Sequence, residues 1–130
     1  MQVESIKDLD HLPISTSPED LGDRINTVFE LIEKRAEGSA ADFAQAFSDV
    51  IGYQSYAGDI PEQSQEKLIN WVRNTYEQSN LPYVDAVASI LCMCNSQPAL
   101  DCLHALIGLT NNQSALNLLK ESVAEIEINT

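Results

Sequence analysis

The amino-acid sequence predicts an all-α protein of about six helices, folded as a single domain over residues 1–130. Three observations predict this fold class. Apolar residues after residue 17 recur at the three- and four-residue spacing of one helical face, and helix-capping residues precede these segments. The second half of the chain also repeats a helix-length pattern every 16 residues. A chain of this length can bury roughly two-thirds of its unfolded surface, so we expect one hydrophobic core.

The first predicted helix covers residues 18–37. Ser17 supplies a capping hydroxyl. Pro18 follows at the first position of the helix, where a backbone N–H would have no acceptor within the helix, so the missing N–H of proline costs nothing. The acids that follow suit the positive end of the helix dipole, and Gly38 is the predicted stop. The apolar face comprises Leu21, Ile25, Val28 and Ile32. Residues 1–16 precede the helical pattern, and both a disordered arm and an ordered segment fit this part of the sequence.

The second predicted helix covers residues 40–51. Ser39 and Asp42 form the pattern of a capping box before it. Its apolar face comprises Phe43, Phe47, Val50 and Ile51. Residues 17–51 are therefore expected to form an acidic helical hairpin. The segment 52–61 contains glycines and a proline without a helical period, so it is the principal predicted loop.

The remaining chain shows a weak 16-residue repeat, from which we predict a helical stack over residues 65–128. The units begin at Gln65, Leu81, Gln97 and Gln113, and polar pairs end them at Ser79-Asn80, Asn95-Ser96 and Asn111-Asn112. One helix and a short turn per unit is the rhythm of stacked helical hairpins. This rhythm resembles HEAT and tetratricopeptide arrays, although the tetratricopeptide signature residues do not occur in order. A HEAT-like stack and an irregular helical bundle both fit the pattern.

The charge of the chain is strongly negative. Twenty acidic residues against seven basic ones give a net charge of -13, and residues 1–66 hold 14 of the acids and four of the bases. Such a field repels nucleic-acid phosphates and anionic lipids, so neither is an expected direct partner. The sequence has no apolar run of ~18 residues and does not begin with a signal-peptide pattern. We therefore expect a cytoplasmic protein.

Three cysteines lie close together in the second half of the chain. Cys92, Cys94 and Cys102 are an odd number, which fits a reducing compartment better than a disulfide framework. With His104 they offer four ligands of the kind that zinc prefers. Residues two apart on a helix point about 200° apart, so Cys92 and Cys94 would not share a metal there. We expect buried thiols and no metal or other cofactor.

Asp101 and His104 are the best candidates for a catalytic pair. They lie three residues apart on a predicted helix and could form a carboxylate–imidazole pair, as in hydrolytic triads and carboxylate-bridged metal sites. Neither set is complete, because the other histidine is His11. Phosphate-binding loops, zinc-protease motifs and nucleophile elbows do not occur. We expect a protein that is not an enzyme, with His104 at a contact between helices.

The more informative pattern is a negative stripe on the first predicted helix. At 100° per residue, five acids lie opposite its apolar face: Glu19, Asp23, Glu30, Glu33 and Glu37. Glu33 and Glu37 form a like-charge pair at i,i+4, which costs helix stability. The stripe is either a solvated face or a binding surface for a basic partner.

The predicted loop adds Tyr53, Tyr56 and Asp59 to the same part of the chain. Tyrosines beside carboxylates often supply anchors at protein interfaces. The same two tyrosines could instead pack over the core.

In size, charge and lack of a catalytic set, the chain resembles the small acidic immunity proteins with which bacteria neutralise their own basic toxins, above all nucleases. The resemblance carries no motif, and immunity proteins have many unrelated folds, so no residue role is transferred. It implies an inhibitor whose carboxylates occupy the cationic cleft of a cognate toxin. The alternative function is a helical adaptor or structural subunit of a larger complex, with Trp71 and the grooves of the stack as apolar anchors.

Overall fold

The computed structural model describes residues 3–11, 17–53 and 60–129. These residues form one short 3-10 helix and six α-helices, and none of them lies in a strand. The elements are η1 (Ile6–His11), α1 (Pro18–Glu33), α2 (Ala40–Tyr53), α3 (Glu62–Thr75), α4 (Leu81–Cys94), α5 (Gln97–Leu109) and α6 (Gln113–Asn129). The predicted all-α fold of about six helices is therefore confirmed.

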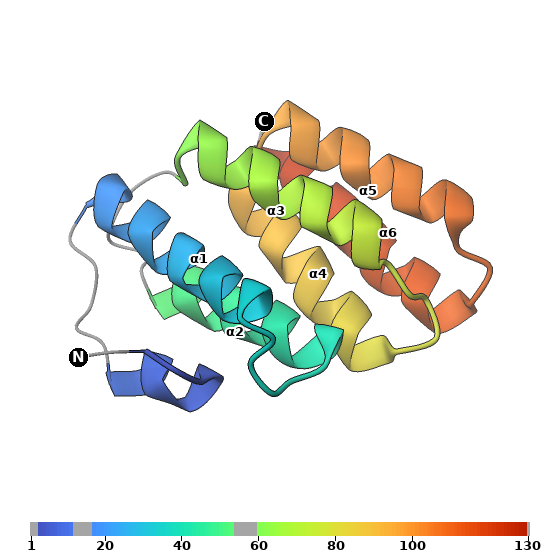
Figure 1. Cartoon of the computed structure of the whole chain (residues 1–130). Coiled ribbons are helices and arrows are strands. Elements are labelled where there is room, and N and C mark those ends of the chain that lie inside the picture. Colours follow the sequence, from blue (N-terminus) through green and yellow to red (C-terminus); the bar gives the residue numbers. More distant parts are fainter. Residues whose placement is uncertain (1–2, 12–16, 54–59, 130) are drawn as a thin grey trace.

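The six α-helices are arranged in two layers (Figure 1). Helices α1, α3 and α5 run in one direction in the first layer, and α2, α4 and α6 run in the opposite direction in the second. Helix α4 lies between α2 and α6 and packs against both. Consecutive helices thus form three antiparallel hairpins that stack side by side. The stacking includes α1 and α2 as well as the segment 65–128.

The predicted repeat has a direct structural counterpart in the helix starts. Helices α4, α5 and α6 begin at the three unit starts Leu81, Gln97 and Gln113. The polar residue before each one caps it: Asn80 accepts the N–H of Tyr83 at 3.2 Å, Ser96 that of Ala99 at 3.4 Å, and Asn112 that of Ala115 at 3.1 Å. Helix α3 begins at Glu62, before the unit start at Gln65. The N–H of Gln65 donates to the carbonyl of Pro61, which is the first hydrogen bond of the helix.

The first helix is shorter than the sequence predicts. It ends at Glu33, and Arg35 takes the left-handed conformation with φ 56°. The N–H of Arg35 donates to the carbonyl of Ile32 at 3.1 Å, and that of Ala36 donates to the carbonyl of Leu31 at 3.0 Å. These two bonds form a Schellman motif with an arginine where glycine is common. The predicted stop at Gly38 is therefore wrong, since the last carbonyls already have partners.

The start of α2 agrees with the predicted capping box. The Ser39 hydroxyl accepts the N–H of Asp42 at 3.2 Å, and the Asp42 carboxylate accepts the N–H of Ser39 at 2.9 Å. Gly38 lies in the turn just before, with φ +153°, and a Cβ there would come within 3.1 Å of Ile6. The close approach of η1 to this turn depends on the missing side chain.

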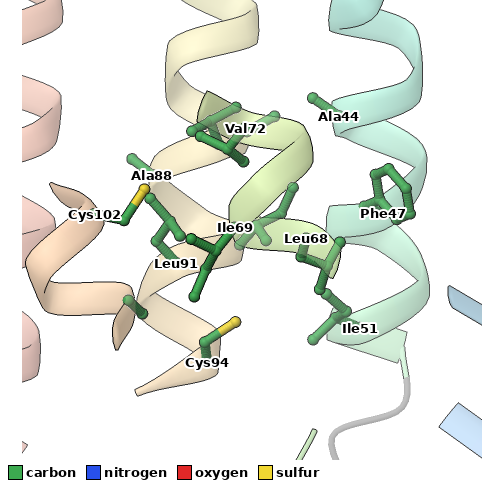
Figure 2. Close-up of a cluster of buried hydrophobic side chains, with 14 of the residues drawn as sticks. Ala44, Phe47, Ile51, Leu68, Ile69, Val72, Ala88, Leu91, Cys94 and Cys102 are labelled. Carbon is green, nitrogen blue, oxygen red and sulfur yellow. The ribbon is translucent and has the colours of Figure 1, made fainter. Parts of the chain in front are cut away.

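The core lies between the two layers, and α3 contributes its centre (Figure 2). Leu68, Ile69 and Val72 point from α3 toward α2 and α4, where Phe47 and Leu91 are among the buried residues that surround them. Helix α3 packs against α1, α4 and α5, and its Trp71 contacts Phe47 of α2, so its burial joins the hairpins into one core. Burial of each large aliphatic side chain stabilises the fold by roughly 1.5–3 kcal/mol.

A chain of aromatic rings crosses the core from α1 to α4. The ring centroids of Phe29 and Phe47 lie 4.7 Å apart, those of Phe47 and Trp71 5.1 Å, and those of Trp71 and Tyr83 6.4 Å. The Tyr83 hydroxyl lies 2.8 Å from that of Thr75, which satisfies its buried polar end. Four helices therefore contact one another through consecutive rings.

Polar contacts join the turns at one end of the stack. The side-chain oxygen of Gln78 accepts the N–H groups of Asn111 and Asn112 at 2.7 and 2.8 Å. The hydroxyls of Tyr76 and Thr110 also form a hydrogen bond. These bonds hold the α3–α4 turn against the α5–α6 turn.

Residues 3–11 pack against α2 at the other side of the stack. Val3, Ile6 and Leu9 are half-buried on the core, and the Asp8 carboxylate accepts the N–H groups of Glu4 and Ser5. The described part of this N-terminal segment is thus a packed turn of 3-10 helix; residues 1–2 and 12–16 lie outside the described residues. No helix among the described residues is both long enough and apolar enough to cross a bilayer.

Candidate protein-binding surfaces

The predicted negative stripe forms an exposed face of α1. Glu19, Asp23, Glu30 and Glu33 are all exposed, and we call these four residues the α1 acidic face. The opposite side of the helix is buried through Leu21, Ile25, Val28 and Leu31. Ile32, expected in the apolar face, is only half-buried, and Leu31 takes the buried place instead. The amphipathic pattern therefore directs the carboxylates to solvent.

The charge of the α1 acidic face is not neutralised within the described part of the chain. Its carboxylates form no ion pair there. A neighbouring base, Lys67 on α3, donates to the side-chain oxygen of Asn26 at 3.2 Å, so it lies beside the stripe and binds a neutral residue. A partner can therefore approach this face without first displacing an internal cation.

Glu37 does not belong to the α1 acidic face. Because α1 ends at Glu33, Glu37 lies in the turn after the left-handed Arg35, and it is exposed there. The predicted i,i+4 pair of Glu33 and Glu37 on a helix is wrong for the same reason. The stripe is one turn shorter than predicted, and Lys34 and Arg35 place two cations at its C-terminal end.

The loop candidates cannot be added to this face. Tyr53 is the last residue of α2, and its side chain lies outside the description. Tyr56 and Asp59 both fall outside the described residues.

The cysteines lie in separate surroundings. Helix α4 continues through Cys94, so Cys92 and Cys94 point to different sides of it, as the helical geometry predicts. Cys94 and Cys102 are buried in the core, whereas Cys92 is half-buried and its thiol donates to the Glu125 carboxylate at 3.0 Å. Among the described residues, no group of three or more His, Cys, Asp and Glu is placed to hold a metal ion.

All three thiols are held in their protonated form. Burial raises the pKa of Cys92 to about 11, with a further contribution from its hydrogen bond to Glu125. Burial also raises the pKa of Cys94 to about 12. The pKa of Cys102 is raised by burial as well, although a hydrogen bond from Arg73 opposes the rise. Since the thiolate is the reactive form, these groups are poor nucleophiles at neutral pH.

Asp101 and His104 do not form the pair that their spacing allows. The side-chain amide of Gln97 donates to Asp101 at 2.8 Å, within the first turns of α5. His104 is exposed on the surface of α5, so the expectation that it lies at a contact between helices is wrong. The cause is the rotation of α5, which buries Cys102, Leu103 and Leu106 instead.

The structure contains a groove between α4 and α6 whose position and acidic lining were not predicted from the sequence. Its volume is about 280 Å³, and we call it the α4–α6 groove. It is lined by Asp85, Ala88 and Ser89 of α4 and by Leu118, Glu121, Ser122 and Glu125 of α6. With Cys92, each helix contributes residues at the same i, i+3, i+4, i+7 spacing. That spacing is visible in the sequence, but the pairing of α4 with α6 is not.

Two contacts show how the helices align along this groove. The Ser122 hydroxyl donates to the carbonyl of Ala88 at 3.3 Å, and Cys92 donates to Glu125 one turn further on. The two helices therefore run parallel in register. Small side chains at Ala88, Ser89 and Ser122 leave the space that forms the groove.

Comparison with known proteins identifies no relative. No family model matches the chain, and no curated protein or solved structure matches it.

Proposed function

We propose that this protein binds a basic partner protein through the α1 acidic face and inhibits it. The observation that carries the proposal is the row of exposed carboxylates on α1, whose charge no described cation neutralises. The net charge of -13 extends the same field over the molecule and would accelerate encounter with a cationic partner.

The mechanism is occlusion of an anion-binding cleft. The α1 acidic face contains two pairs of carboxylates, Glu19 with Asp23 and Glu30 with Glu33, and the members of each pair lie roughly 5–6 Å apart on the same side of the helix. A helix with such a row can occupy the cationic cleft of a nuclease and exclude its substrate. We therefore propose that the partner is a basic toxin, with nucleases first, and that this chain serves as its immunity protein.

The scaffold suits this role. Helix α1 lies at the edge of its layer, where it packs against α2 and α3 and leaves its acidic face uncovered. The aromatic contact of Phe29 with Phe47 fixes α1 to the core. The helix holds the backbone of these residues in place before binding, so only their side chains lose conformational freedom in the complex.

The alternative, a helical adaptor, has one supporting observation. Leu109 at the end of α5 is a large apolar residue whose side chain is 69% exposed. Trp71, which the sequence analysis expects as an anchor of the adaptor, packs edge-on against Phe47 and Tyr83 and therefore belongs to the core. The acidic face has the stronger support.

The test begins with capture of partners from a lysate of the native host at low salt, followed by elution with rising salt. We expect a basic protein to elute, its enzymatic activity to be inhibited by this chain, and its association rate to fall at least about ten-fold between low and high ionic strength. A nuclease assay with the eluted protein checks the toxin proposal directly.

Two variants, each with four carboxylates neutralised, separate the effect of the α1 acidic face from the effect of net charge. The first is E19Q/D23N/E30Q/E33Q, and the control, on α3, the α3–α4 turn and α5, is E62Q/E66Q/E77Q/D101N. We expect the first to lose inhibition and the second to keep it. Equal losses in both variants, or a salt-resistant partner bound equally by both, would contradict the proposal; the second result would favour the adaptor.

A further inference from the structure

We infer that the α4–α6 groove docks an arginine side chain from an extended segment of a basic partner protein. The groove opens on the α2–α4–α6 layer, away from α1, so it forms a second surface. Asp85, Glu121 and Glu125 are exposed at its edges, and no described helix covers it.

The shape of the groove suits a long side chain. Its volume of about 280 Å³ is several times the ~30 Å³ that one water occupies in the liquid. The lining residues extend over two turns of α6, roughly 10 Å, and over one turn of α4, roughly 6 Å. Ser122 is 92% buried, as its exposure of 8% shows, and its bond to Ala88 closes the floor with no polar group left unsatisfied.

The lining is mostly polar, with two apolar side chains between the charged walls. Ala88 and Leu118 can contact the methylene groups of an arginine, while the carboxylates stand on both sides. Asp85 lies on the α4 wall, and Glu121 and Glu125 lie on the α6 wall. The guanidinium group carries five N–H donors in a planar fork that matches carboxylate pairs, which a single lysine ammonium does not.

The charge of the surrounding layer favours binding of a cation in the groove. Neither α2 nor α4 contains a lysine or an arginine, and Lys120, the one base of α6, is not among the lining residues. A cationic side chain that enters the groove therefore meets carboxylates without a competing internal cation. Charge complementarity excludes an acidic segment.

The inference shares with the proposed function only the basic character of the partner. It concerns a different layer and can be tested with a short peptide, without the native partner. Loss of groove binding would leave the role of α1 intact, and failure of the α1 proposal would leave the groove intact.

The experiment is an amide chemical-shift titration of the full chain with the capped tripeptide acetyl-Ala-Arg-Ala-amide. The neutral control replaces arginine with citrulline, which has nearly the same shape. We expect saturable shifts at Ser89, Cys92 and Ser122 with the arginine peptide and none with the citrulline peptide. Equal shifts with both peptides, or no saturable shift at these amides, would overturn the inference.

Two charge-matched variants complete the test. D85N/E121Q/E125Q removes the walls of the groove, and E19Q/D23N/E30Q removes three charges from α1. We expect the first to weaken peptide binding at least about ten-fold and the second to change it less than about two-fold. If both variants weakened peptide binding equally, net charge alone would account for the binding, and the inference would be overturned. The single exposed change Glu121→Gln, expected to weaken binding about three-fold, decides the matter if the triple variant does not fold.

Discussion

The rings of Phe47 and Trp71 meet edge to face, with centroids 5.1 Å apart and an angle of 63° between their planes. This contact joins α2 to α3 at the centre of the aromatic chain, where Phe47 is fully buried. Edge-to-face pairs add roughly 0.5–1.5 kcal/mol to the stabilisation that burial alone provides. The contact therefore links two hairpins of the stack.

Phe47→Ala is predicted to lower the free energy of unfolding by about 3–5 kcal/mol, because it leaves a cavity and removes contacts to both Phe29 and Trp71. Urea denaturation followed by Trp71 fluorescence measures this change. Leu109→Ala is the matched control, and it should cost less than about 0.5 kcal/mol because Leu109 is exposed. Similar losses for the two variants would mean that the aromatic chain does not hold the core.

The two glycines Gly38 and Gly108 should respond to alanine in opposite directions. Gly38→Ala is predicted to destabilise the fold by about 1 kcal/mol or more, because φ is +153° and the new Cβ would press on Ile6 and Phe43. Gly108→Ala should stabilise it by about 0.5–1 kcal/mol, since Gly108 lies inside α5 with open space around it. Thermal unfolding of both variants checks the signs; a loss at Gly108 would contradict the prediction.

The repeated caps are predicted to be worth about 1 kcal/mol each. Asn112→Ala removes the acceptor for the N–H of Ala115 and should destabilise the start of α6 by that amount. The adjacent Asn111→Ala should change stability by less than about 0.5 kcal/mol, because only its backbone N–H is bonded, to Gln78. Hydrogen exchange of the first amides of α6 distinguishes a lost cap from a general loss of stability.

Stability is predicted to fall at alkaline pH through the buried thiols. The pKa of Cys92 is raised from 9.0 to about 11 and that of Cys94 from 9.0 to about 12, so both bind their protons more tightly in the folded state. Their contribution is fully present below pH 9 and is lost as the pH rises through these values. Tyr83, raised from 10.0 to about 12 by burial, acts in the same direction.

Denaturation curves between about pH 8 and pH 11 measure this dependence. The C92A/C94A variant is less stable at neutral pH but should lose stability less steeply as the pH rises. A slope equal to that of the unchanged protein would show that the thiols do not control alkaline unfolding.

Local patterns predicted most of the helix boundaries. Asn80, Ser96 and Asn112 precede helices in the sequence, and each one caps a helix in the structure. The end of α1 was missed because the Schellman motif uses Arg35, a residue without the usual preference for the left-handed conformation. Boundaries are predictable where the residue type and the backbone conformation agree.

The candidate surfaces also differ in how far the sequence predicts them. The exposure of Glu19 and Asp23 follows from the period of a single helix, so the sequence alone predicts it. The α4–α6 groove requires two helices 33 residues apart to lie in register, as the contact of Cys92 with Glu125 shows. His104 was misplaced because its exposure depends on the rotation of α5 against its neighbours. Tertiary pairing, which local patterns do not contain, decides these cases.

The opposed directions of the two helical layers also determine where the electric field of the molecule originates. Three helices point one way and three the other, so their macrodipoles largely cancel (Figure 1). The long-range field is then set by ionised side chains, which bring the isoelectric point to about 4.2. Acidification toward that pH should abolish the long-range attraction for a cation and remove the mutual repulsion between copies of the chain, which promotes precipitation.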